Sequence, residues 1–273
     1  MPFLENLGAS VYWDEQGSGA PFLLISELAW SSNFWHRIRP LLRGRYRTIA
    51  FDNRGTGQSS AVAPYSIPQM AADAAAVLNA ARVNAAHIFG FGMGGMIAQE
   101  LALQYPKKVR SLILGGTSPG GPAVVSLEPD VITALKTAEH SDQFLSVLNA
   151  LGHAEGTLPQ RVQEDLEMAK KAGASSDVCA AQLRAIETWD AGSRLQELSV
   201  PTLVIHGEDD RIFPAKNAQL LASKIPGAKL KLIARAGYLF LTDQPEASQA
   251  ALLEFLTAQA TRKSERATPV LER

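Results

Sequence analysis

The chain has 273 residues, 46% of them hydrophobic, and a net charge of −1. This length suits one large α/β domain with an inserted subdomain, and the near-neutral charge argues against nucleic acid or an anionic membrane surface as a partner. No stretch approaches the roughly 20 apolar residues of a membrane span, and the amino terminus lacks a signal-peptide pattern, so we expect a cytoplasmic protein.

Short apolar runs alternate with helical stretches along most of the chain. Strands are predicted at residues 10–14, 22–25, 48–51, 87–89, 111–114, 202–205 and 229–233. Helices are predicted near residues 33–42, 67–82, 93–105, 214–224 and 245–260. Short and almost wholly apolar strands are typical of a parallel sheet that is covered on both faces. The alternation therefore predicts an α/β protein with a doubly wound, mostly parallel sheet.

The alternation stops between residues 119 and 199, where only helical stretches are predicted, near 129–150, 159–172 and 177–190. We interpret residues 119–199 as a helical cap, inserted into a sheet domain that residues 1–118 and 200–260 form. Residues 261–273 are polar and charged, and we expect them to be a flexible tail.

A glycine-rich turn is the most informative motif. The segment Gly90-Phe91-Gly92-Met93-Gly94-Gly95 follows a predicted strand and opens a predicted helix. This is the context of a nucleophile elbow, G-x-S-x-G, in which the central serine sits on a sharp turn. Gly92 stands at the serine position and has no side chain. The N–H groups at the start of the helix remain available to an anion or a developing oxyanion.

The chain to about residue 260 resembles the α/β-hydrolase fold superfamily. Besides the elbow, residues 51–59 resemble the D-x-R-G-x-G-x-S loop of that family, and residues 205–214 resemble the segment that bears the triad acid. Residues 234–246 resemble the segment that bears the triad histidine. The resemblance implies the fold, the helical cap and the order nucleophile, acid, base along the chain.

Three catalytic positions depart from the family pattern. Gly92 replaces the nucleophile and Tyr238 replaces the histidine, while the triad acid is retained at Asp210. The loop that usually reads His-Gly here reads Ser26-Glu27. A serine mechanism needs hydroxyl, imidazole and carboxylate as a unit, so hydrolysis through an acyl-enzyme is not supported.

The candidate catalytic residues are therefore Glu27, Asp210 and Tyr238. Burial near the elbow would raise the pKa of Glu27 and make it an acid or base, whereas a Glu27 turned to solvent would be an ordinary loop residue. Asp210 is a base, an acceptor for the Tyr238 hydroxyl, or a relic carboxylate held by backbone N–H groups. Tyr238 is either a hydrogen-bond donor to a carbonyl or enolate or a plug that fills the old site.

The remaining candidates surround the turn. The backbone N–H groups of Met93 and Leu28 are expected to act as oxyanion donors beside Gly92, and Trp30 and Trp189 are expected to line an apolar pocket. The pocket is expected between the carboxyl ends of the strands and the cap. The sequence shows no metal-ligand spacing, phosphate loop or dinucleotide fingerprint, so no metal and no cofactor are expected.

These features predict a non-hydrolytic enzyme that eliminates, decarboxylates, cyclises or isomerises a small carbonyl-bearing metabolite. The resemblance implies a role in specialised metabolism, to which members of the superfamily have been recruited for such steps. The expected partner is a small-molecule substrate, and the oligomeric state stays open, with a homodimer among the options. Two alternatives stand beside this hypothesis. The first is a catalytically inactive relative that binds a small ligand or a protein partner. The second is a weak hydrolase in which a carboxylate activates water.

Overall fold

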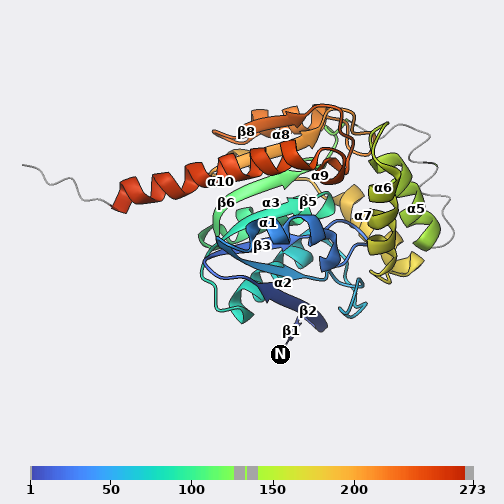
Figure 1. Ribbon diagram of the computed structural model, residues 1–273. Coiled ribbons are helices and arrows are strands. Elements are labelled where there is room, and N and C mark those ends of the chain that lie inside the picture. Colours follow the sequence, from blue (N-terminus) through green and yellow to red (C-terminus); the bar gives the residue numbers. More distant parts are fainter. Residues whose placement is uncertain (1, 126–132, 134–140, 268–273) are drawn as a thin grey trace, which may run out of the picture.

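The fold is built on a central sheet, which a computed structural model shows in Figure 1. The structure describes residues 2–125, 133 and 141–267. The strands are β1 (Phe3–Asn6), β2 (Ala9–Gln16), β3 (Ala20–Ile25), β4 (Tyr46–Phe51), β5 (Ala86–Phe91), β6 (Val109–Gly115), β7 (Thr202–Gly207) and β8 (Lys229–Ile233). Their order is β1-β2-β4-β3-β5-β6-β7-β8, and all neighbours are parallel except β1 with β2 and β2 with β4. This confirms the predicted fold class.

Helices cover the sheet and join its parallel strands. The α-helices are α1 (Arg39–Leu42), α2 (Ile67–Ala80), α3 (Met93–Gln104), α5 (Ser141–Gly152), α6 (Pro159–Lys170), α7 (Ser176–Thr188), α8 (Lys216–Lys224), α9 (Phe240–Asp243) and α10 (Pro245–Ala267). Short 3-10 helices are η1 (Ser32–Arg37), η2 (Pro106–Lys108) and η3 (Leu195–Glu197). Helix α3 packs on α2 and against β5 and β6. Every residue of β7 is buried, as the unbroken apolar pattern predicts for a strand covered on both faces.

The structure differs from the predicted elements in three places. The amino-terminal edge strand β1 was not expected. The predicted helix 33–42 is instead η1 followed by the short α1, which begins with Arg39 and Pro40. A proline cannot donate a backbone hydrogen bond and clashes with the preceding turn, so one continuous helix is broken there. The predicted helix 245–260 also ends too early, because α10 continues to Ala267.

Helices α5, α6 and α7 lie in the segment between β6 and β7 and gather at one end of the sheet (Figure 1). The part of the predicted helix 129–150 that precedes residue 141 lies outside the described residues, except for residue 133. The division of the chain into a core and a cap stays a prediction.

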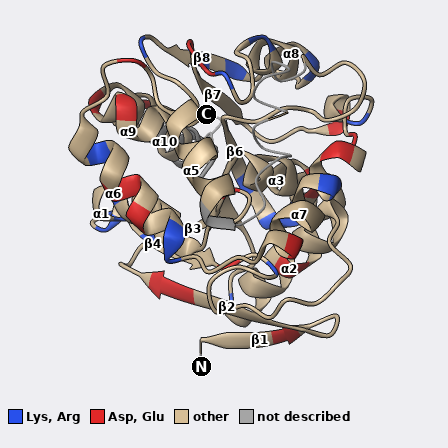
Figure 2. Cartoon of the chain, turned by 90° about the vertical axis from the view of Figure 1, so that its right-hand side faces the viewer, with Lys and Arg blue, Asp and Glu red and all other residues tan. Residues whose placement is uncertain are grey.

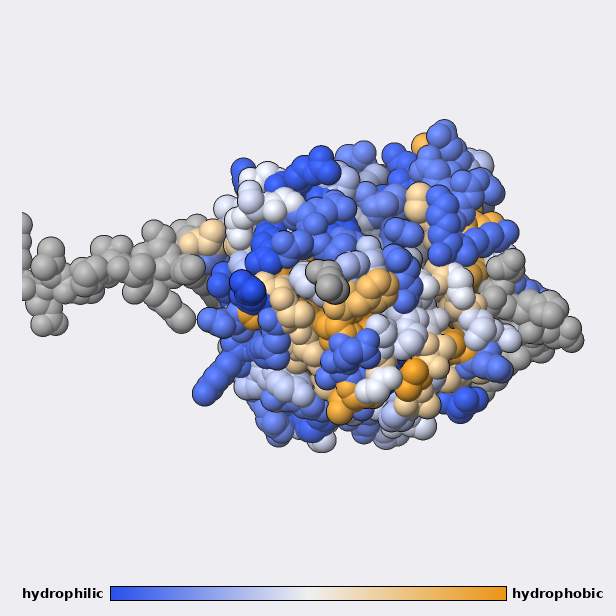
Figure 3. Space-filling model, turned by 90° about the horizontal axis from the view of Figure 1, so that it is seen from below, coloured by the Kyte–Doolittle hydropathy of each residue, from blue (hydrophilic) through white to orange (hydrophobic). Residues whose placement is uncertain are grey.

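The surface carries charges of both signs. Figure 2 shows acidic and basic residues interspersed over the end that carries α5, α6 and α7. Figure 3 shows another face, on which apolar surface gathers in the middle of hydrophilic residues. Phe3 and Leu7, in and beside β1, are exposed. Within the described residues, no helix has both the length and the hydropathy to cross a membrane.

Candidate active site

The elbow lies at the junction of β5 and α3. Gly92 has φ +54° and ψ −118°, a conformation that glycine adopts more readily than other residues. Its N–H donates to Gly115 O at 2.9 Å, and its carbonyl accepts from Thr117 Oγ1 at 2.7 Å. An added Cβ at Gly94 would lie 2.1 Å from Ile25 O, so α3 can approach β3 only with glycine there. The motif therefore keeps its strand–turn–helix geometry without the serine.

Glu27 lies in the loop after β3 and is only 4% exposed. Its Oε2 accepts a hydrogen bond from the Met93 N–H at 2.8 Å and another from the Tyr238 hydroxyl. The Leu28 N–H also stabilises the ionised carboxyl. Both backbone donors expected beside Gly92 thus act on the Glu27 carboxyl. The solvent-facing alternative for Glu27 is wrong.

The absent side chain of Gly92 leaves the space that Glu27 and Tyr238 occupy. A Cβ built on Gly92 would lie 1.2 Å from Glu27 Oε2 and 1.9 Å from the Tyr238 hydroxyl oxygen. No side chain at position 92 is compatible with these distances, since real Cβ atoms do not come closer than about 3 Å to such neighbours. The carboxyl of Glu27 has therefore taken the place of the serine side chain in an ordinary elbow.

Tyr238 follows β8 and is fully buried. Its ring lies edge-on to Phe91, with centroids 5.0 Å apart, and it also packs near Phe213. Burial, followed by the charge of Glu27, raises the pKa of the phenol well above its usual value. Tyr238 therefore keeps its proton at neutral pH and acts as a donor, which excludes it as a base.

Burial also dominates the electrostatics of Glu27. Loss of solvation raises the pKa of this carboxyl to about 7, although the hydrogen bonds from Tyr238, Met93 and Leu28 lower it. The negative charge of Asp210 raises it further. At neutral pH the carboxyl is therefore present in both protonation states, which is the condition that a general acid or base requires.

Asp210 does not accept the Tyr238 hydroxyl, contrary to one of the two catalytic options expected for it. Its Oδ1 accepts from the N–H groups of Ile212 and Phe213, each at 2.8 Å. Its Oδ2 lies 2.8 Å from His206 Nε2, which is also 2.5 Å from Phe213 O. These contacts are those expected of a relic carboxylate that shapes the turn after β7. The influence of Asp210 on Glu27 and Tyr238 is electrostatic.

The two tryptophans have different surroundings. Trp30 packs edge-on against Phe34, with centroids 5.1 Å apart, and lines a small cavity together with Leu239. Trp189 instead donates its indole N–H to Glu100 Oε2 at 2.8 Å. Arg194 holds the same carboxylate, so Trp189 connects the end of α7 to α3. The role of both tryptophans in a substrate pocket stays a prediction.

Sequence reasoning missed Gln182, a fully buried residue of α7. Its Oε1 accepts from the Ala29 N–H at 2.8 Å, and its Nε2 donates to Arg54 O at 3.0 Å. Ala29 has φ +62°, an uncommon conformation for a residue with a Cβ. Gln182 thus fixes the loop that carries Glu27. A lone glutamine in a polar helix gives no sequence signal for such a contact.

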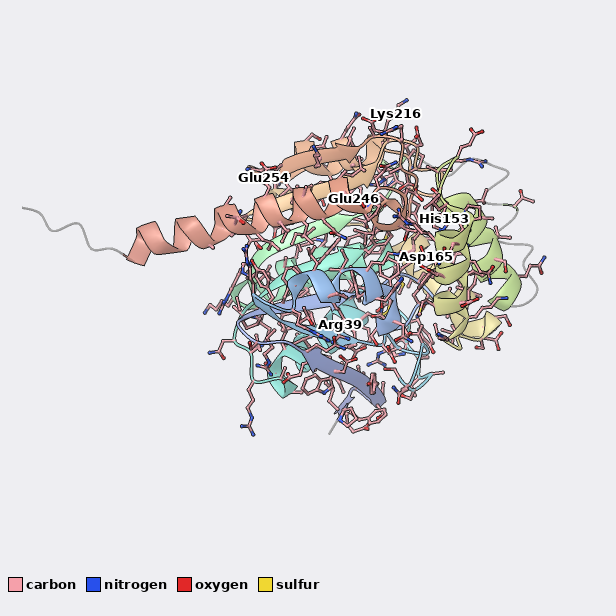
Figure 4. The ribbon with its side chains drawn as sticks, viewed as in Figure 1. Arg39, His153, Asp165, Lys216, Glu246 and Glu254 are labelled. Carbon is pink, nitrogen blue, oxygen red and sulfur yellow. The ribbon has the colours of Figure 1, made fainter. Side chains whose placement is uncertain are left out.

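Asp243 fixes the loop of Tyr238, the hydrogen-bond partner of Glu27. Its Oδ2 accepts from the N–H of Gly237, which precedes Tyr238, at 2.7 Å, and its Oδ1 lies 2.8 Å from His153 Nδ1. The His153 ring also faces Asp165 of α6, at 3.7 Å, and Figure 4 shows these two residues close together where α6 meets α9. The loop of Tyr238 is therefore tied to the helices between β6 and β7.

The pKa of Glu27 predicts a specific pH dependence of stability. Because the folded-state pKa of about 7 lies above the ordinary value of 4.5, the native state binds more protons than the unfolded state between these values. The free energy of unfolding must then fall as pH rises through this window. Between about pH 5 and pH 8, we expect the wild type to lose about 2–3 kcal/mol more than Glu27→Gln. Urea unfolding of both proteins measures this difference, and parallel pH profiles would contradict it.

Among the described residues, no group of three or more His, Cys, Asp or Glu side chains is arranged to hold a metal ion. The polar atoms that converge at the elbow are one carboxyl, one phenol and backbone N–H groups. This set can transfer a proton and stabilise an oxyanion.

Comparison with known proteins agrees with the fold. A family model described as alpha/beta hydrolase fold matches residues 20–245. The chain is 29% identical over 259 residues to a putative carbamate hydrolase RutD from Azorhizobium caulinodans, covering 93% of this chain and 98% of the relative. It is 30% identical over 246 residues to a protein of the same description from Variovorax paradoxus, covering 87% and 92%. A hydrolase from Pseudomonas aeruginosa superposes with a TM-score of 0.81 at 27% identity, covering 93% and 97%.

Proposed function

Because the chain belongs to the α/β-hydrolase fold family, we propose that it uses this scaffold for proton transfer, with Glu27 as the general acid or base. The observation that carries the proposal is the position of Glu27 Oε2, which fills the place of the missing serine and is held by Met93 N–H and the Tyr238 hydroxyl. The substrate class is a small carbonyl-bearing metabolite, and no covalent intermediate forms at residue 92.

The proton-transfer step follows from the contacts of Glu27. The ionised carboxylate takes a proton from the carbon next to the substrate carbonyl, so that a C–H bond breaks and an O–H bond forms on Glu27. The electron pair of the C–H bond moves into the substrate as an enolate. Once protonated, Glu27 is a weaker acceptor, so the Met93 N–H becomes available to the enolate oxygen and the Tyr238 hydroxyl can rotate toward it. Negative charge thus moves from Glu27 to the substrate while the same donors stabilise it.

Elimination, decarboxylation, cyclisation and isomerisation all use an enolate or its equivalent together with a proton donor. After the enolate reacts, protonated Glu27 can return its proton to carbon or to a leaving group. A pKa of about 7 suits both directions at neutral pH. The proposal therefore specifies the proton-transfer group and the oxyanion donors, and each of these reactions remains compatible with it.

Deuterium exchange tests this step before the natural substrate is known. Acetoacetate, methyl acetoacetate and 2-oxobutanoate are incubated with the protein in heavy water, and proton NMR follows the loss of the hydrogens next to each carbonyl. We expect accelerated exchange with at least one compound, absent in Glu27→Gln. Exchange that is equal in both proteins, or that stays at the rate without protein for all three compounds, would count against the proposal and favour a binding protein.

Hydrolysis by a water molecule that Glu27 activates is the second candidate function. It is supported by the relatives described as putative carbamate hydrolases, and it also uses the buried carboxylate as a base. In this case the Glu27 carboxylate takes a proton from water, and the water oxygen forms a bond to the substrate carbonyl carbon. The tetrahedral intermediate then collapses, so that the bond to the leaving group breaks and the proton on Glu27 passes to the leaving group. Incubation with ethyl carbamate separates the two functions, because this compound has no hydrogen on a carbon next to its carbonyl, so only hydrolysis can convert it, with release of ethanol and ammonia.

Neither candidate uses a serine nucleophile, so we expect no burst with activated esters. Assays with p-nitrophenyl acetate and butyrate should give rates close to those of heat-inactivated protein, since position 92 offers no hydroxyl and position 238 no imidazole. Saturable turnover with a burst equal to the enzyme concentration would reveal a covalent acyl-enzyme and overturn both candidates.

A further inference from the structure

A second hollow lies at the opposite end of the sheet from Glu27. It has a volume of about 850 Å³ and is lined by residues at or next to the first residues of β3, β4, β5, β6 and β7, by the turn before β8, and by the second half of α10. Figure 1 shows α10 running from α9 across the sheet and beyond its far end, so that the helix overhangs this edge. A volume of this size is within the range of small-molecule sites.

The hollow is basic. Arg45 and Arg110 both line it, and none of the described residues in its lining is acidic. Neither guanidinium has an ion-pair partner among the described residues, whereas Arg47, two residues after Arg45, is paired with Glu15. Two unpaired guanidinium groups in one concave surface favour an anion, because each can donate charge-assisted hydrogen bonds to a carboxylate, sulfonate or phosphate.

The rest of the lining combines aromatic and apolar groups. The rings of Tyr46 and His87 lie edge to face, with centroids 5.8 Å apart, and both line the hollow next to Leu256. The Arg45 charge acts on the Tyr46 hydroxyl, since it lowers the pKa of a phenol that burial raises. The cationic and aromatic parts of the lining are therefore adjacent.

We propose that this hollow is a binding site for a small organic anion with an apolar body, separate from the reaction centre. The anionic group would bind Arg45 and Arg110, and the body would lie against Tyr46, His87 and Leu256. His87 is five residues before Gly92 on the chain, and β5 runs between them, so the two sites are about 16 Å apart at the usual rise of a strand. The ligand of this site therefore does not reach Glu27.

Calorimetric titration with 2-naphthoate tests the site, with the neutral isostere 2-naphthamide and inorganic phosphate as comparison ligands. We expect 2-naphthoate to bind at least about tenfold more tightly than either, because only it supplies both the charge and the apolar body. Arg45→Gln and Arg110→Gln should each weaken its binding about tenfold. Arg43→Gln is the matched control, because Arg43 is an exposed arginine of the same loop that does not line the hollow.

Three results would overturn the proposal. Equal weakening of 2-naphthoate binding by Arg43→Gln would show a nonspecific charge effect. Equal affinity for 2-naphthamide or phosphate would show that the site does not select an anion with an apolar body. Unchanged binding in both Arg45→Gln and Arg110→Gln would place the ligand outside the hollow. Glu27→Gln should leave the affinity unchanged, so this test does not depend on the proposed reaction. Circular dichroism of each variant verifies folding.

Discussion

Replacing Glu27 by Gln is expected to reduce the rate of the proton-transfer reaction by about 10²–10⁴-fold, the usual contribution of a general acid or base. The amide keeps the size of the side chain and can still accept from Met93 and Tyr238, but it cannot take up a proton. Ligand affinity should therefore stay within about tenfold of the wild type. The measurement is the exchange or turnover rate of a compound identified in the heavy-water assay.

The pH profile adds a second expectation for the same residue. If Glu27 is the base, kcat/KM of the wild type should rise with pH through about 7, the pKa of the buried carboxyl, and this limb should vanish in Glu27→Gln. Glu208→Gln is a suitable control, since Glu208 is an exposed carboxyl in the loop after β7, at the same edge of the sheet. Unchanged turnover in Glu27→Gln would assign the proton transfer to another group, such as Asp210, the other candidate carboxylate.

Restoring the serine at Gly92 is expected to disable the site and to destabilise the protein. The new Cβ would meet Glu27 Oε2 at 1.2 Å, so Glu27 must move and its hydrogen bond with Tyr238 must break. A side chain at φ +54° adds about 1–3 kcal/mol of backbone strain. We expect Gly92→Ser to lose the proton-transfer activity, to gain no efficient esterase activity, and to unfold at lower urea concentration than the wild type.

Two further variants isolate the steric part of this effect. Gly173 has φ +63° and nothing within 4 Å of an added Cβ, so Gly173→Ser reports the cost of backbone strain alone. In the double variant Gly92→Ser with Glu27→Ala, the nearer conflicting group is gone and only the Tyr238 hydroxyl still overlaps the new Cβ, so stability should recover in part relative to Gly92→Ser. Additive effects in the double variant would mean that the two side chains do not compete for one space. Efficient ester hydrolysis by Gly92→Ser would show that a base other than histidine is already in position.

The elbow could be predicted from the sequence because the requirements of its turn are local. Its glycines at positions 90, 92 and 94 meet requirements that are local to the turn, such as the close approach of Gly94 to Ile25. Requirements of this kind restrict neighbouring residues and therefore produce a recognisable sequence motif. The absence of a hydroxyl at position 92 and of an imidazole at position 238 was equally visible, because both positions lie inside recognisable segments.

The sequence predicts the loss of the nucleophile at position 92 but not the reason for glycine there. The structure adds this constraint, since any side chain there would overlap Glu27 and Tyr238. Asp210 illustrates the opposite case, in which a segment matched the family pattern but its carboxylate binds backbone N–H groups and His206 rather than Tyr238.

The sequence by itself determined the parallel sheet and the elbow without a nucleophile, because apolar periodicity and turn motifs act over a few residues. The candidate acid/base residues followed from the resemblance of their segments to those of the α/β-hydrolase family. Only the tertiary structure decided that Glu27 faces inward and accepts the hydroxyl of Tyr238, a residue 211 positions away. It also decided that Gln182 holds the Glu27 loop from a distance of 153 positions. Such contacts depend on how the loops at the carboxyl ends of β3 and β8 and the helix α7 come together, and burial in that arrangement is what raises the pKa of Glu27.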